Sequence, residues 1–94
     1  MSVEFDSVYN HHERAVFNAV ANAVPRYPGL RAELLPDVAC VALNRLPPRY
    51  IRHEVDFAFY LTEQEREDNE TAITEAVEFA FNFVQARSAM RARR

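Results

Sequence analysis

The fold depends on one stretch in the middle of the chain, which reads Asp37-Val38-Ala39-Cys40-Val41-Ala42-Leu43-Asn44-Arg45-Leu46-Pro47-Pro48-Arg49-Tyr50. Its first half is apolar at nearly every position, a pattern typical of a helix that is buried on most sides. Pro36 suits the first turn of such a helix, and the charge of Asp37 favours the positive end of the helix dipole. We therefore predict a helix over residues 36–46 at the centre of the core.

Two prolines end this helix. Pro47 and Pro48 lack the amide hydrogen that a helix needs, and each disfavours the α region for the residue before it. The chain must therefore leave the helix in an extended conformation. Apolar residues then recur at a period of two, which predicts a short strand or extended segment over residues 55–61 that can reach back to Tyr50: Val55, Phe57, Phe59 and Leu61.

A long helix follows this segment. Thr62 and Glu65 have the spacing of a capping box, and the acids at the start of the segment favour the positive end of a helix. We predict that the helix begins at Glu63 and ends near Ala89. Its apolar residues form one stripe with three phenylalanines beside it: Ile73, Val77, Ala80 and Val84, then Phe79, Phe81 and Phe83.

A further helix is predicted before the central stretch. Asp6 or Ser7 can cap it, and Pro25 and the Pro28-Gly29 pair stop it after Ala23. Its apolar stripe is predicted to contain Val8, Ala15, Phe17, Val20 and Val24. The fold class is therefore mainly α, a small single domain over residues 1–94 of three helices and one short extended or β segment, with frayed ends in the first few residues and in residues 88–94.

The apolar surface of these helices exceeds what one small domain can cover. Three phenylalanines on one helix and an apolar central helix leave a surplus, and association of two copies would bury it. We therefore expect a homodimer, formed through either the central or the last helix.

Composition narrows the class of protein. No apolar run approaches the ~20 residues that cross a bilayer, and the first residues lack the features of a signal peptide, so we expect a cytoplasmic protein with no membrane partner. The single cysteine, Cys40, excludes an internal disulfide and is expected to be a small buried hydrophobe. The net charge of -3 disfavours broad binding to nucleic acid, so DNA is not an expected partner.

All 11 basic residues are arginines, and several of them surround the proline pair. Either codon bias explains this, or the planar guanidinium is used to bind phosphate. Arg45, Arg49 and Arg52 lie near Tyr50, so the loop could bind an anionic nucleotide. In the structural alternative, Arg45 meets the last carbonyls of the helix and Tyr50 packs in the core.

The stretch from Asp37 to Tyr50 resembles the signature of the late competence development ComFB family, in which an Asp opens an apolar helix that ends in Leu-Asn-x-Leu-Pro-Pro-Arg-Tyr. The resemblance implies a small, mainly helical, dimeric protein without catalysis, and some bacterial members are receptors for cyclic dinucleotides, notably cyclic di-GMP. Other members carry a cysteine cluster before this motif, where this chain has Leu34-Leu35-Pro36, so a zinc site is not implied. The ligand-binding residues that we infer are Asp37, Asn44, Arg45, Pro47, Pro48, Arg49, Tyr50 and Arg52.

Other candidate sites are weaker. His11 and His12 diverge by about 100° on a helix and His53 lies in another segment, so no metal site is expected. Glu54 and Asp56 flank His53 without a nucleophile or a cofactor motif, so we expect neither catalytic residues nor a cofactor. Two functions remain: a non-enzymatic signalling receptor for a cyclic dinucleotide, or an adaptor whose Arg-rich loop contacts an acidic protein and binds no small molecule.

Overall fold

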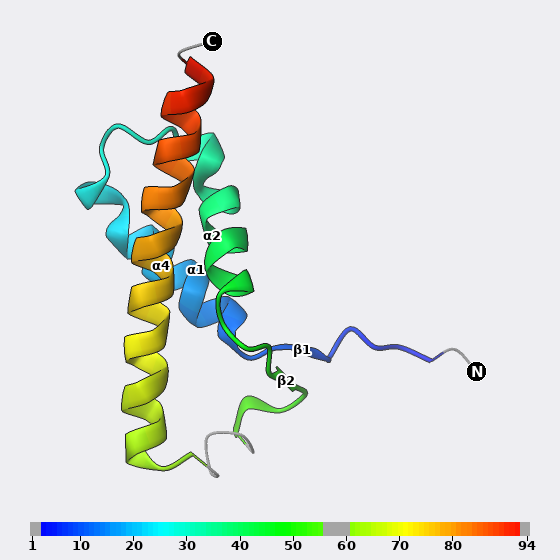
Figure 1. Ribbon diagram of the computed structural model, residues 1–94. Coiled ribbons are helices and arrows are strands. Elements are labelled where there is room, and N and C mark those ends of the chain that lie inside the picture. Colours follow the sequence, from blue (N-terminus) through cyan, green and yellow to red (C-terminus); the bar gives the residue numbers. More distant parts are fainter. Residues whose placement is uncertain (1–2, 56–60, 93–94) are drawn as a thin grey trace.

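The computed structural model describes residues 3–55 and 61–92. Within these residues three helices pack side by side: α1 (His12–Ala23), α2 (Leu35–Asn44) and α4 (Glu63–Ala92) (Figure 1). Two short 3-10 helices, η1 (Val24–Arg26) and η2 (Ala32–Leu34), connect α1 to α2. Strands β1 (Tyr9–Asn10) and β2 (Tyr50–Ile51) form a small antiparallel pair beside the first turn of α1. The predicted class, three helices with a short β segment, is confirmed in this part of the chain.

The core lies where α2 packs against both other helices. Phe81 of α4 is completely buried, and its ring stacks on that of Tyr27 with centroids 4.2 Å apart. The central position predicted for the second helix is confirmed. The buried apolar side chains are Val16, Val20, Ala23, Val38, Ala39, Ala42, Leu46, Ala76, Val77, Ala80, Phe81 and Val84.

Helix α1 starts later than predicted. The expected cap at Asp6 or Ser7 is wrong, because residues 9 and 10 form β1 and the helix begins only at His12. Val20 of the predicted stripe is buried and Val24 packs against the core, whereas Val8, Ala15 and Phe17 are exposed and Val16, outside the predicted stripe, is buried. Pairing with β2, which periodicity within one segment cannot reveal, therefore delays the start of α1, and contacts with α2 and α4 decide the side that it buries.

Strand β2 confirms that the chain is extended at Tyr50. Tyr9 pairs with Ile51 and Asn10 with Tyr50, so the sheet joins segments about forty residues apart in sequence. Most of the predicted extended segment, residues 56–60, lies outside the described residues. At its first position the prediction is wrong, since Val55 has helical backbone.

Helix α4 begins at Glu63, as predicted, and continues past the expected end to Ala92. The hydroxyl oxygen of Thr62 accepts a hydrogen bond from the backbone N–H of Glu65 at 3.1 Å, which confirms one half of the capping box. Val77, Ala80 and Val84 of the predicted stripe are buried, and Ile73 packs against the core from its edge. None of the helices described here is long and apolar enough to cross a membrane.

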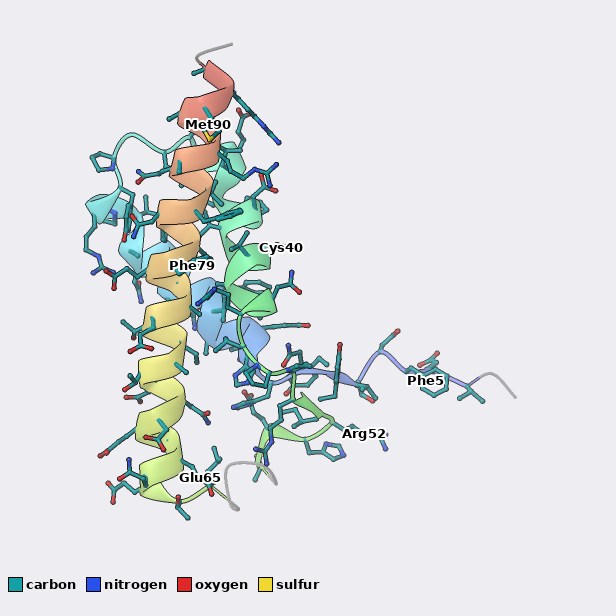
Figure 2. All side chains as sticks on the ribbon, in the orientation of Figure 1. Phe5, Cys40, Arg52, Glu65, Phe79 and Met90 are labelled. Atoms are coloured by element: carbon teal, nitrogen blue, oxygen red, sulfur yellow. The ribbon has the colours of Figure 1, made fainter. Side chains whose placement is uncertain are left out.

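The expectation that Cys40 is buried is wrong. Its side chain is exposed on α2, as Figure 2 shows, because α1 and α4 contact other sides of the helix. Val41 and Leu43 are only half-buried. The apolar helix α2 therefore keeps an uncovered face in a single chain.

Candidate functional site

The predicted ligand-binding residues lie along the uncovered face of α2 and in the loop that follows it. Asp37, Asn44 and Arg45 are exposed on or at the end of α2, and Pro47 and Pro48 are exposed after it. The Asn44 side chain donates a hydrogen bond to the Cys40 carbonyl, one turn back.

Arg45 reaches from the end of α2 to α4. The central carbon of its guanidinium lies 3.7 Å from the centre of the Phe79 ring, a cation–π contact. The Phe79 ring stacks on Phe83, with centroids 5.8 Å apart, and Arg87 lies over Phe83 at 5.8 Å. Because the two rings are 38% and 39% exposed, this row remains open to a ligand from outside.

Arg49 and Arg52 have partners on the other side of the loop. The backbone N–H of Arg49 donates to the side-chain oxygen of Asn10 at 3.1 Å, and the Arg49 carbonyl accepts from the N–H of His11. The guanidinium Nε of Arg52 donates to the Ser7 hydroxyl at 3.1 Å. These bonds join the loop to the segment before α1, and Figure 2 shows Arg52 beside β2, away from Phe79.

The side chain of Tyr50 is 69% exposed, although the residue lies in β2. The packed-core position of the structural alternative is therefore wrong for Tyr50. An exposed aromatic ring next to Arg49 is available for stacking.

His12 lies beneath the loop. It is 7% exposed, and its Nδ1 atom is buried without a hydrogen-bond partner among the residues that the structure describes. Burial is the main cause that lowers its pKa below the ordinary value, the nearby charges of His11 and Arg49 lower the pKa further, and a hydrogen bond to the Pro47 backbone opposes them. Burial therefore favours the neutral form of His12, which supports the first proline of the loop.

The pKa of His11 is also lowered from its ordinary value. Burial lowers its pKa most, Arg49 lowers it further, and Glu54, whose carboxylate lies 4.0 Å from the Nδ1 atom, raises it. His53 is exposed in a separate segment. Within residues 3–55 and 61–92 no three His, Cys, Asp or Glu side chains gather in a way that could hold a metal ion.

Two hollows lie beside α2 in the part of the chain that the structure describes. The α2–α4 groove, about 700 Å³, lies between the start of α2 and the last turns of α4 and includes Arg31, Asp37, Phe83, Arg87 and Arg91. The α1–α2 groove, about 550 Å³, is lined by apolar side chains, among them Phe17, Leu35, Ala39 and Leu43.

A known family model also covers most of this chain. The family model of the late competence development protein ComFB matches residues 9–88. The chain belongs to the ComFB family. No curated protein and no solved structure matches it.

In this ComFB chain the site contains residues that sequence reasoning did not identify. Asn10 and His12 were not predicted to touch the proline loop, because the contact depends on the pairing of β1 with β2. The aromatic and basic side chains on α4 could have been identified from their spacing in the sequence. They recur every four residues, which places them on one side of a helix: Phe79, Phe83, Arg87 and Arg91.

Proposed function

We propose that this ComFB protein is a non-enzymatic, cytoplasmic signalling receptor for a cyclic dinucleotide, cyclic di-GMP, bound at the end of α2 and the loop after it. The observation that carries the proposal is the Arg45 guanidinium stacked on the exposed ring of Phe79. A guanine base can join or replace such a stack, and guanidinium forks bind phosphate oxygens in pairs. The resemblance of the stretch from Asp37 to Tyr50 to a family with some cyclic dinucleotide receptors supports this class of ligand.

The rest of the loop supports the same reading. Arg49 and Tyr50 are exposed next to each other, and Asn10 and His12 support the backbone around them. A held loop loses little conformational freedom when a ligand binds, which favours affinity. Arginine stays protonated at any physiological pH, so these side chains suit binding and charge recognition better than proton transfer.

Calorimetric titration of the purified protein with cyclic di-GMP tests the proposal, with cyclic di-AMP as the comparison ligand. We expect binding at micromolar concentration or tighter, and we expect Arg49→Ala to abolish it. Arg14→Ala removes the same charge from an exposed position on α1 and should bind like the unaltered protein. Folded protein that gives no heat with either ligand would contradict the receptor.

The second candidate function is an adaptor that contacts another protein and binds no small molecule. The observation that favours it is the exposure of Arg49 and Arg52 on the surface of the loop, where a carboxylate of a partner protein could reach them. Its contact with an acidic partner would use Arg49 and Arg52 of the loop. An adaptor should show no change in thermal stability with cyclic di-GMP, whereas a receptor gains about 2.7 kcal/mol at a hundredfold excess over the dissociation constant.

We also propose that two copies of the chain associate. Phe17 is 50% exposed beside the α1–α2 groove, and Leu35 and Leu43 of that groove are only partly buried. A second copy would cover these side chains with a matching apolar surface. The net charge of -3 and the acidic start of α4 offer little attraction for DNA, so DNA is not among the proposed partners.

A further inference from the structure

The α2–α4 groove differs from the loop in both position and chemistry. It lies at the opposite end of α2 from the prolines, between the first turns of α2 and the last turns of α4. Its volume of about 700 Å³ is within the range of ~300–1,000 Å³ that is usual for small-molecule sites. Unlike the α1–α2 groove, it combines charged side chains with an aromatic ring.

The basic side chains of the groove come from two segments of the chain. Arg87 and Arg91 follow each other by one turn of α4, and Arg31, just before η2, lines the same groove. Arg31 forms an ion pair with Glu33, which offsets its charge. Arg87 and Arg91 are therefore the side chains best placed to bind a phosphate group.

An aromatic ring lies next to these arginines. Phe83 lines the groove and is 39% exposed, and its ring centroid lies 5.8 Å from the Arg87 guanidinium and 5.8 Å from the Phe79 ring. A planar base could stack at the edge of this row while its phosphate stays near the guanidinium groups. A ligand without a ring would leave the Phe83 surface uncovered.

Asp37 supplies a group that can distinguish guanine from adenine. Its carboxylate lines the same groove, and when ionised it can only accept hydrogen bonds. Guanine presents two adjacent N–H donors on its pairing edge, which two carboxylate oxygens can accept together. Adenine presents an amino group beside an acceptor nitrogen, and a carboxylate would repel that nitrogen.

We propose that the α2–α4 groove is a binding site for a guanine nucleotide unit, with the base on Phe83 and Asp37 and the phosphate on Arg87 and Arg91. The inference rests on the proposed function for the link to a cyclic dinucleotide, and it adds the place where one base and one phosphate bind. The Arg45–Phe79–Phe83–Arg87 row connects this groove to the loop. One cyclic di-GMP could therefore contact both regions.

The experiment uses the full chain and two probes, GMP for the groove and cyclic di-GMP for the whole site, with AMP as the comparison base. Calorimetric titrations compare the unaltered protein with Arg91→Ala, Asp37→Asn and the charge-matched control Arg14→Ala. We expect Arg91→Ala to weaken the binding of GMP about tenfold, the loss of one charge-assisted hydrogen bond. Asp37→Asn should reduce the preference for GMP over AMP, and Arg14→Ala should change neither.

The outcomes distinguish failure of the groove site from failure of the proposed receptor function. Cyclic di-GMP binding that Arg49→Ala abolishes, and that Arg91→Ala and Asp37→Asn leave unchanged, would overturn the groove and keep the receptor. GMP binding that depends on Arg91, without binding of cyclic di-GMP, would support the groove and contradict the receptor. If neither probe binds to folded protein, both are overturned. Arg91 is exposed in the last turn of α4, so its variant should fold, and a thermal melt checks this.

Discussion

His12 shows how a single residue connects packing to the candidate site. Its imidazole is buried where α1 begins, next to His11 and Arg49, and it bonds the backbone of Pro47. Protonation there would place a positive charge in a poorly solvated position beside the Arg49 charge. The loop is therefore supported by a side chain whose pKa is lowered by burial and by the neighbouring charges.

The first prediction concerns the pH dependence of stability. The folded pKa of His12 lies below the unfolded value, so between the two values the unfolded chain binds more protons. The stabilisation is complete above the ordinary histidine pKa of about 6.5 and is lost as pH falls through the folded pKa. Urea unfolding at several values between about pH 5 and about pH 8 should show stability rising with pH.

The matched variants are His12→Gln and His53→Gln. His12→Gln should flatten the rise in stability without removing it, because the pKa of His11 is lowered too. His53 is exposed, so its replacement should leave the slope as it was. If the free energy of unfolding rises equally with pH in all three proteins, His12 does not contribute to this pH dependence.

At the scale of elements, different contacts stabilise the start and the middle of α4. Its middle packs against α2 and α1, whereas in its first two turns the residues from Glu63 to Asp68 are exposed. The first turn is held by the Thr62 cap and by a hydrogen bond from Gln64 to Asp68. Local contacts therefore control the start of α4, and the core controls the rest.

The second prediction is that Thr62→Ala loosens the start of α4. Loss of an N-terminal cap costs about 1 kcal/mol, because the N–H of Glu65 loses its partner. Hydrogen exchange of the amides in the first turn should become about fivefold faster. Exchange around Phe81 should change much less, and Thr62→Ser, which keeps the hydroxyl, is the control. Unchanged exchange in Thr62→Ala would contradict the role of the cap.

At the scale of the whole molecule, one chain leaves apolar surface uncovered on both sides of α2. Phe17 and the α1–α2 groove lie on one side, and Phe79 and Phe83 lie on the other. The second side also carries Arg45 and Arg87, which suits a charged ligand. The apolar side has no such charge, so it is the side that we assign to a second copy.

The third prediction is that Phe17→Glu separates the proposed dimer. A carboxylate in the contact would have to lose its water without a partner, which costs several kcal/mol per ion. Sedimentation should then show a monomer with the helical content of the unaltered protein. Phe5→Glu changes an exposed ring on the segment before β1 and serves as the control. A monomeric unaltered protein would contradict the dimer itself.

Local sequence was sufficient for part of this structure. The order of the helices, the end of α2 before the proline pair and the start of α4 at Glu63 follow from prolines, a capping residue and helical periodicity, which act over a few residues. The ComFB family also follows from the stretch around these prolines, and the match over residues 9–88 confirms it.

Tertiary structure decided the rest. The β1–β2 pair, the burial of His12, the exposure of Cys40 and the stacking of Arg45 on Phe79 each depend on contacts between segments distant in sequence. A pattern along the chain shows that a helix has an apolar side but not which neighbour covers it. The sequence by itself therefore determined the elements and the family, and their packing determined which side chains are left for a ligand.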